Sequence, residues 1–140
     1  MPAFPRLRST LLSQFPNVAC AMSTRQGEDA TAPFGFNLGF HVGDEETRVQ
    51  GNLRRFLDTV DLAPDDMAFM DQVHEDRIAE ATEAGEYAAC DGLFTRQPRL
   101  GLAVRVADCV PILLYAPAEN TVAAVHAGWR GTAEHLAKKM

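Results

Sequence analysis

Hydrophobic positions recur with two different periods along the chain, and each period predicts its own kind of element. From Val49 to Val60 large apolar residues return every three or four positions, which is typical of an amphipathic helix. Asp44 stands just before this stretch and is the expected N-cap, with acidic residues in the first turn after it. From Leu100 to Ala107 large and small side chains alternate instead, which predicts a strand with one large apolar face.

Short apolar runs bounded by turn residues predict the other strands. They cover residues 17–24, 67–70, 77–80, 91–95, 111–115 and 121–126. Only Ala-Pro-Ala-Glu-Asn separates the last two runs, which indicates a hairpin. Residues 25–43 are expected to form a long loop, and Thr132 is the expected N-cap of a short helix that reaches Met140. The pattern predicts an α/β (α+β) fold, a mixed β-sheet with flanking helices.

Length, charge and cysteine content narrow the class of protein. A chain of 140 residues that is 46% hydrophobic can build one ordinary core, so we expect a single domain over residues 1–140. The net charge of −6 would repel phosphate backbones and anionic lipids, so neither nucleic acid nor a membrane is an expected partner. No apolar run approaches the length of about 18 residues that spans a bilayer. Three cysteines without a CxxC pair fit a reducing compartment, and we expect a cytoplasmic protein.

Three side chains that can bind a metal fall at strand ends or in the turns beside them. His74 follows the predicted strand 67–70, Cys109 follows the strand that ends at Ala107, and His126 ends the last strand. Two imidazoles and one thiolate, with a fourth position left for water or substrate, are typical of a catalytic zinc site. Spacing alone leaves the alternative that Cys109 is a small buried packing residue and that both histidines are satisfied by ordinary hydrogen bonds near the surface.

The segment after His126 indicates an anion site. Gly128 and Gly131 permit a close approach of the backbone, and Arg130 supplies a forked donor. A helix start near Thr132 would add free N–H groups that suit a phosphate. The alternative is a glycine-containing loop with a solvated arginine and a Trp129 that packs in the core.

Seven short motifs occur in an order that resembles one known family. They are Ser23-Thr24-Arg25, Asn37-Leu38-Gly39, His41-Val42-Gly43-Asp44, Gln72-Val73-His74, Asp91-Gly92-Leu93, Ala107-Asp108-Cys109-Val110-Pro111 and His126-Ala127-Gly128-Trp129-Arg130-Gly131. Together they resemble the YfiH-like family, also called laccase-domain or multicopper polyphenol oxidase proteins and described as purine nucleoside phosphorylases. The likeness extends from about Val18 onward, and the ADC and HAGWRG motifs are its most specific parts.

The resemblance implies a zinc-dependent enzyme that phosphorolyses adenosine, inosine and methylthioadenosine and can also deaminate adenosine. A purine nucleoside and phosphate are therefore the expected substrates. The metal ligands of the family carry over to His74 of the QVH motif, Cys109 of the ADC motif and His126 of the HAGWRG motif.

The resemblance also carries roles for residues outside the ligand set. Arg25 and Asn37 match family positions near the pocket and are assigned to substrate, and His41 in the same loop is a further candidate. Asp108 and Arg130 are the expected catalytic residues because of their own chemistry and their places next to the candidate ligands, not because of the resemblance. Arg130 would bind phosphate, whereas Asp108 is open to three roles, as an acid, a base or a carboxylate that orients a metal-bound histidine.

Two alternatives to a zinc phosphorylase stay open. The laccase label implies Cu²⁺ and phenol oxidation, but a single trio of ligands cannot assemble several coppers, and redox-inert zinc suits group transfer better. The family continues beyond its HAGWRG motif by roughly a third of a domain, so we expect an incomplete version of the family domain. A non-enzymatic metal-binding domain and self-association are therefore also considered.

Overall fold

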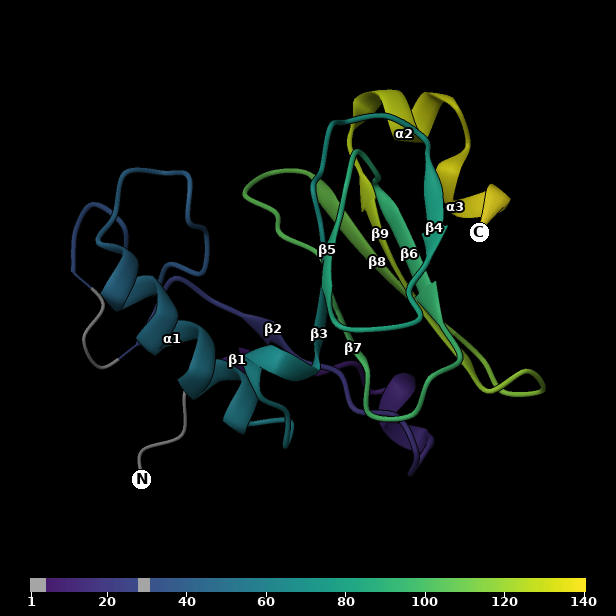
Figure 1. Ribbon diagram of the computed structural model, residues 1–140, viewed down its shortest axis with the longest axis horizontal. Coiled ribbons are helices and arrows are strands. Elements are labelled where there is room, and N and C mark those ends of the chain that lie inside the picture. The colour runs from purple at the N-terminus through teal and green to yellow at the C-terminus, as the bar shows by residue number, and fades with distance from the viewer. Residues whose placement is uncertain (1–4, 28–30) are drawn as a thin grey trace. The chain divides into compact units, whose positions relative to one another are not determined.

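The computed structural model describes residues 5–27 and 31–140 (Figure 1). The chain divides into two compact units, one that ends at Pro64 and one that runs from Asp65 to Met140. The single domain expected over residues 1–140 stays a prediction. The fold class is confirmed, because the chain is a mixed α/β structure with several small sheets and few helices.

The first unit consists of two short strands, one long helix and extended connections. Strand β1 (Arg6–Leu7) pairs antiparallel with β2 (Met22–Ser23), and the 3-10 helix η1 (Leu12–Gln14) lies between them in the sequence. The strand predicted over residues 17–24 is therefore reduced to β2. Helix α1 (Glu46–Asp58) buries Val49 and Leu57 on one face, as the helical period predicted.

Helix α1 begins one residue later than its capping pattern suggested. The N-cap is Glu45, so the prediction that Asp44 is the N-cap is wrong by one residue. The carboxylate of Asp44 serves the loop before the helix instead. It accepts hydrogen bonds from the backbone N–H of Glu45 at 2.8 Å and from Nδ2 of Asn37 at 3.2 Å.

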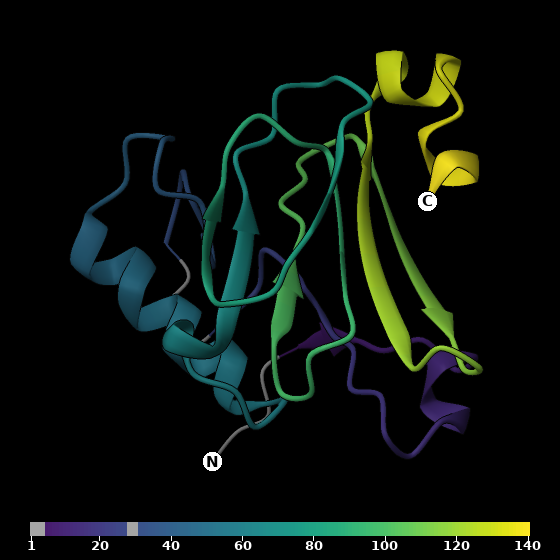
Figure 2. The same ribbon diagram turned by 45° about the vertical axis from the view of Figure 1, so that its right-hand side comes forward.

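Two small sheets form the second unit, which begins within the 3-10 helix η2 (Pro64–Asp66) (Figures 1 and 2). The first sheet has the order β5-β3-β7, with both pairs parallel, and contains β3 (Met67–Met70), β5 (Gly85–Tyr87) and β7 (Gly101–Ala103). The second sheet has the order β4-β6-β9-β8 and contains β4 (Ile78–Glu80), β6 (Gly92–Thr95), β8 (Val110–Ala116) and β9 (Thr121–Ala127). Strands β4 and β6 are parallel, whereas β9 is antiparallel to both β6 and β8. The β8–β9 pair confirms the predicted hairpin.

Both sheets contribute to one hydrophobic core. Met70 of β3, Leu93 of β6 and Ala124 of β9 are buried in the same cluster, and Leu102 of β7 packs against it. Burial of this kind of side chain contributes about 1.5–3 kcal/mol for each large residue. The core therefore holds the strand ends at fixed positions, and the candidate ligands lie at those ends or in the segments next to them.

The helices at the end of the second unit differ from the prediction. Helix α2 (Trp129–Ala133) follows β9 directly with Gly128 as its N-cap, and α3 (Leu136–Lys139) comes after it. The N–H of Thr132 donates to the carbonyl of Gly128 at 2.9 Å, so Thr132 lies inside the helix and its prediction as an N-cap is wrong. Among the described residues no helix combines the length and the apolar character that crossing a bilayer requires.

Candidate metal centre

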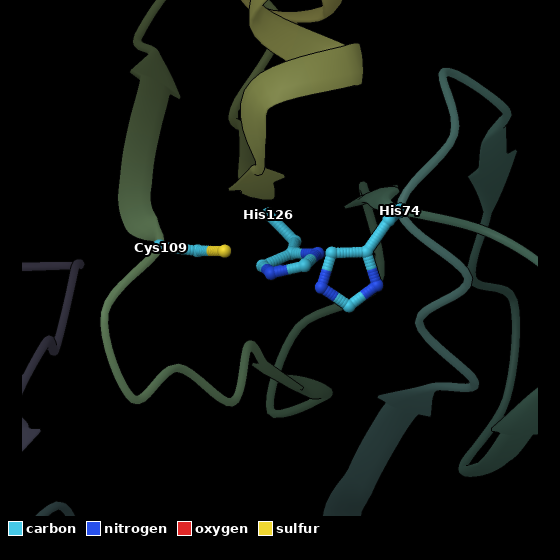
Figure 3. Close-up of side chains that lie close together, drawn as sticks. All are labelled: His74, Cys109 and His126. Carbon is cyan, nitrogen blue, oxygen red and sulfur yellow. The ribbon is translucent and has the colours of Figure 1, made fainter.

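His74, Cys109 and His126 lie together in the second unit, as the sequence predicted. One ligand atom of each side chain lies within 4.8 Å of the corresponding atoms of the other two. The two imidazole rings meet edge to face, with centroids 4.7 Å apart and planes at 82°. Figure 3 shows the sulfur of Cys109 pointing towards the ring of His126, with the ring of His74 beside it.

The antiparallel hairpin explains how Cys109 reaches His126. In the β8–β9 register Val110 pairs with Ala127 and Pro111 pairs with His126. Cys109, the residue before β8, therefore lies beside the end of β9. The prediction that Cys109 follows a long strand over residues 100–107 is wrong, because β7 ends at Ala103.

Gly128 borders all three ligands. A Cβ atom at this position would lie 3.2 Å from Cδ2 of His74, 3.7 Å from Sγ of Cys109 and 3.8 Å from Cε1 of His126. Any larger side chain would occupy the space that the three ligands share. The bare Cα of Gly128 thus leaves room for an ion, which is the close backbone approach expected of a glycine.

A single carboxylate holds both histidines. Oδ1 of Asp91 lies 2.6 Å from Nδ1 of His126 and accepts the backbone N–H of His74 at 3.0 Å. Oδ2 accepts the backbone N–H groups of Val73 at 3.1 Å and Glu75 at 3.0 Å. The turn that carries His74 therefore wraps its N–H groups around the anion, in the manner of a backbone nest.

Asp91 is itself fixed in a fully buried position. Its backbone N–H donates to the carbonyl of Arg77 at 3.0 Å, and its carbonyl accepts the N–H of His126 at 2.8 Å. Burial raises the pKa of the Asp91 carboxyl, but the hydrogen bonds from His126 and from the backbone of residues 73–75 together outweigh burial and leave the pKa below its ordinary value. The group is thus an ionised carboxylate at neutral pH.

Gln72 ties the His74 turn to the segment that leads to Cys109. Its Nε2 donates to the carbonyl of Arg105 at 2.7 Å, and its Oε1 accepts the N–H of Arg105 at 2.8 Å. The side-chain amide of Gln72 thus occupies the backbone N–H and carbonyl of Arg105, which would otherwise pair with a neighbouring strand. This explains why β7 ends at Ala103. Together Asp91 and Gln72 connect the segments that bear all three ligands.

Sequence reasoning missed the roles of both Asp91 and Gln72. Each residue lies within a motif singled out for its resemblance, Asp91 in DGL and Gln72 in QVH. Their hydrogen-bond partners, however, lie 16 to 35 residues away along the chain. Only the fold brings such partners together, so the motifs themselves were the available signal.

Asp108 and Arg130 both lie close in sequence to the ligands and have exposed side chains. Asp108 directly precedes Cys109, and Asp91 rather than Asp108 contacts a ligand histidine. The guanidinium of Arg130 lies 5.1 Å from the ring centroid of Trp129, and that ring is 74% exposed. The prediction that Trp129 packs in the core is therefore wrong. The catalytic roles of Asp108 and Arg130 stay predictions.

The three predicted substrate contacts lie in the first unit, where two of them organise their own loop. Nη2 of Arg25 donates to the carbonyl of Pro33 at 2.8 Å. The amide of Asn37 exchanges hydrogen bonds with the backbone of Gly39 at 2.9 and 2.8 Å. His41 is exposed. These contacts stabilise the loop conformation, and the assignment of the three side chains to substrate stays a prediction.

The ligand group fits a divalent ion by its chemistry and its size. Imidazole nitrogen and thiolate sulfur are ligands that Zn²⁺ prefers, at about 2.0–2.3 Å, so the nitrogen and sulfur ligands around a tetrahedral ion lie about 3.3–3.6 Å apart. The three ligand atoms all lie within 4.8 Å of one another, so they would have to approach somewhat to surround an ion. The His-Cys-His group can therefore bind a metal ion.

The fold and this group define an α/β protein with a metal-ligand cluster at the edge of a mixed sheet. Over residues 19–140 the chain matches the family described as multi-copper polyphenol oxidoreductase laccase. The chain belongs to this family, which confirms the resemblance seen in the motifs.

Relatives and solved structures agree with this assignment. A purine nucleoside phosphorylase of Corynebacterium glutamicum is 41% identical over 122 residues, which cover 84% of this chain and 50% of that protein. The purine nucleoside phosphorylase YlmD of Geobacillus stearothermophilus is 35% identical over 90% of this chain and 50% of its own length. The crystal structure of the hypothetical protein YfiH of Bacillus licheniformis superposes with a TM-score of 0.81 at 37% identity and covers 86% of this chain and 49% of that one. The chain thus spans about half the length of the relatives it matches.

Proposed function

We propose that the protein is a zinc-dependent purine nucleoside phosphorylase that acts on adenosine, inosine and methylthioadenosine. The observation that carries the proposal is the group of two imidazoles and one thiol within 4.8 Å, in a chain whose relatives are named purine nucleoside phosphorylases. Zinc fits this donor set and has no redox chemistry of its own, which suits group transfer.

In phosphorolysis the bond between the ribose C1′ and the purine nitrogen breaks, and a phosphate oxygen forms a new bond to C1′. The products are free purine and ribose 1-phosphate. Arg130 is the proposed phosphate contact, because its forked guanidinium is exposed four residues after His126 and can bind phosphate through two N–H groups. Thr132 takes no part in this proposal, because its N–H is bonded within α2.

Asp108 is the proposed carboxylate beside the reacting sugar or base. It is exposed and next in sequence to Cys109, so it can face a molecule bound at the centre. An anion there stabilises the oxocarbenium-like character of a cleaving glycosidic bond, and a carboxyl can also hold a proton for the leaving purine. Asp91, in contrast, is fully buried and is bonded to the histidines.

Adenosine deamination is the proposed second reaction of the same site. Water replaces the exocyclic amino group of the purine, and ammonia leaves. A bound zinc ion would supply Lewis acidity and would lower the pKa of bound water to about 7. The chain supplies His74, Cys109 and His126 to hold the ion and Asp108 to accept or return a proton.

Metal analysis joined to a product assay tests the proposal. The protein is purified and its zinc and copper contents are measured, and it is then incubated with inosine with and without phosphate while free purine is quantified. We expect one zinc per chain and phosphate-dependent purine release, with loss of both in Cys109→Ala. Zinc binding without purine release would instead indicate a non-enzymatic metal-binding domain.

The copper alternative predicts a different pair of results. A polyphenol oxidase would contain copper and consume oxygen with a phenol. Among the residues that the structure describes, one group of three ligands meets the requirements for a metal site, and one such group is too small for a multicopper cluster. Oxygen uptake by a copper-loaded sample would overturn the zinc proposal.

The proposal also includes the cellular location and the oligomeric state of the protein. Cys20, Cys90 and Cys109 are free thiols, which suits the cytoplasm. Strand β8 stands at one end of the β4-β6-β9-β8 order and exposes Val110, Leu113 and Leu114, so self-association through this strand is proposed. Sedimentation analysis across a concentration series measures it.

A further inference from the structure

We infer that Asp91 is the positioning residue of the metal centre, a single carboxylate that sets the ring of His126 and the backbone turn of His74 for the same ion. The inference deepens the proposed zinc centre and rests on it. Asp91 does not belong to the group of possible metal ligands and does not reach substrate, because it is fully buried. Its effect is exerted through the two histidines.

The ring of His126 is oriented by its bond to Oδ1. Nδ1 of His126 lies 2.6 Å from Oδ1 of Asp91, and a carboxylate oxygen accepts hydrogen bonds, so Nδ1 is the ring nitrogen that donates to Asp91. Nε2 is then the ring nitrogen that is left to bind an ion. His126 therefore presents Nε2 as its ligand atom, and the ring cannot rotate without breaking the bond in a buried site where His126 is 3% exposed.

The turn of His74 is held through its backbone. Three successive N–H groups, those of residues 73 to 75, donate to the same carboxylate at 3.0–3.1 Å. This wrapping requires the left-handed conformation of His74, with φ at 62°, which a non-glycine residue adopts at some cost. The anion offsets that cost, since three N–H donors find their acceptor only in this conformation.

The shared carboxylate couples the two histidines geometrically. Oδ1 contacts both the ring of His126 and the N–H of His74, so a displacement of one changes the bond to the other. Carboxylates that hydrogen-bond metal-bound histidines contribute about 10–100-fold to metal affinity. We expect the loss of Asp91 to fall at the upper end of that range, because two ligands depend on it.

Asp91→Asn removes the charge and one of the two acceptor oxygens while the size of the side chain stays nearly the same. With its carbonyl oxygen towards His126, the new amide turns its NH₂ group against the N–H groups of Val73 and Glu75. With the amide reversed, its NH₂ group faces Nδ1 of His126 and forces the proton onto Nε2, which removes the lone pair that would bind the ion. Neither orientation satisfies all four donors.

Asp76→Asn is the matched control. Asp76 lies two residues after His74, and its exposed side chain forms an ion pair with Lys139. The control therefore removes the same charge from the same region without touching either ligand. We expect its zinc dissociation constant to stay within about twofold of the unchanged protein, since exposed ion pairs contribute little.

The first measurement uses the unchanged protein without metal. Nitrogen-15 NMR of labelled histidine reports which ring nitrogen carries the proton, and we expect the Nδ1–H form for His126. An Nε2–H form would overturn the inference. The experiment requires neither substrate nor activity, so a failure of the proposed phosphorylase reaction leaves it intact, and it decides the matter even where Asp91→Asn does not fold.

The second measurement compares metal binding. Competition with a chromophoric chelator gives the zinc dissociation constants of the unchanged protein, Asp91→Asn and Asp76→Asn, and we expect a weakening of about 100-fold in Asp91→Asn alone. At saturating Co²⁺ the visible spectrum of Asp91→Asn should differ from that of the other two proteins, which a residue with a merely structural role would not cause. Equal affinities and superimposable spectra would overturn the inference, as would an unchanged protein that binds neither metal.

Discussion

The two histidines of the centre belong to opposite kinds of structure. His126 lies in the last strand, is 3% exposed and is held through its ring by Asp91. His74 lies in an exposed turn with a positive φ and is held through its backbone, so its ring retains more freedom. One ligand is thus fixed by side-chain chemistry inside the core and the other by main-chain geometry at the surface. A metal site can therefore combine a rigid ligand with an accessible one when a single carboxylate holds both histidines.

His126→Ala tests the buried side of this comparison and should have the largest effect. Structural zinc sites with four protein ligands bind the ion with about 10–16 kcal/mol, which is about 3 kcal/mol for each ligand. Removal of one ligand should therefore weaken zinc binding on the order of a hundredfold. The substitution also leaves the buried Asp91 carboxylate without its ring partner. We therefore expect the free energy of unfolding of the metal-free protein to fall by about 2–4 kcal/mol. Chelator competition and urea unfolding measure the two losses. A metal-free variant as stable as the unchanged protein would contradict the buried role.

His74→Ala tests the exposed side and should weaken zinc binding about as strongly while it leaves the metal-free fold nearly unchanged. The side chain is exposed, so its removal should alter stability by no more than about 0.5 kcal/mol. His135→Ala is the control, because His135 has a similar φ of 57° against 62° and lies outside the ligand group. The same urea and chelator measurements apply. If His74→Ala destabilised the metal-free protein as much as His126→Ala does, the distinction between the two histidines would be wrong.

Gly128→Ala should reduce zinc affinity by about tenfold with little loss of stability, because φ at Gly128 is −72° and alanine adopts it without strain. The added methyl would lie 3.2 Å from Cδ2 of His74, closer than to the other ligands, and the exposed ring can yield where the buried one cannot. NMR shifts of the histidine ring protons should therefore change more at His74 than at His126. A larger change at His126 would reverse the comparison.

Gln72→Ala should have the smallest effect, a few-fold loss in zinc affinity. Two hydrogen bonds to Arg105 disappear, each worth about 1 kcal/mol, and the segment before Cys109 is loosened from the His74 turn. The bond between Asp91 and His126 should persist, with an unchanged Nδ1–H signal. An altered His126 tautomer in this variant would show that the buried contact between Asp91 and His126 depends on the exposed turn that carries His74.

The hydrophobic pattern of the sequence was sufficient to predict elements whose interacting residues lie close together along the chain. The helix from Glu46 and the β8–β9 hairpin followed from hydrophobic period and a short turn, and the hairpin placed Cys109 beside His126. The predicted strand to Ala107 failed because the backbone of Arg105 pairs with a side chain that is 33 residues away. Thr132 failed as a helix start for a local reason, since α2 begins directly after Gly128.

The ligands of the site could be predicted, but their support could not. Imidazole and thiol groups are recognisable metal ligands by residue type, but spacing alone left a packing role open for these residues. The resemblance of the QVH, ADC and HAGWRG motifs to the family selected His74, Cys109 and His126. A carboxylate such as Asp91 has many ordinary roles, and only its burial and its contacts separate positioning from turn formation. Asp108, the carboxylate next to a ligand in sequence, was the natural choice, but the histidines are bonded to Asp91.

Because protein groups alone hold His126 and the His74 turn, folding and metal loading can be separate events. Small zinc domains commonly fold only when the ion arrives, so that a chelator denatures them. Here the hydrogen bonds of Asp91 and Gln72 exist between parts of the polypeptide, independent of any ion. We therefore expect the metal-free protein to keep both histidines close to the positions in which they would bind the ion.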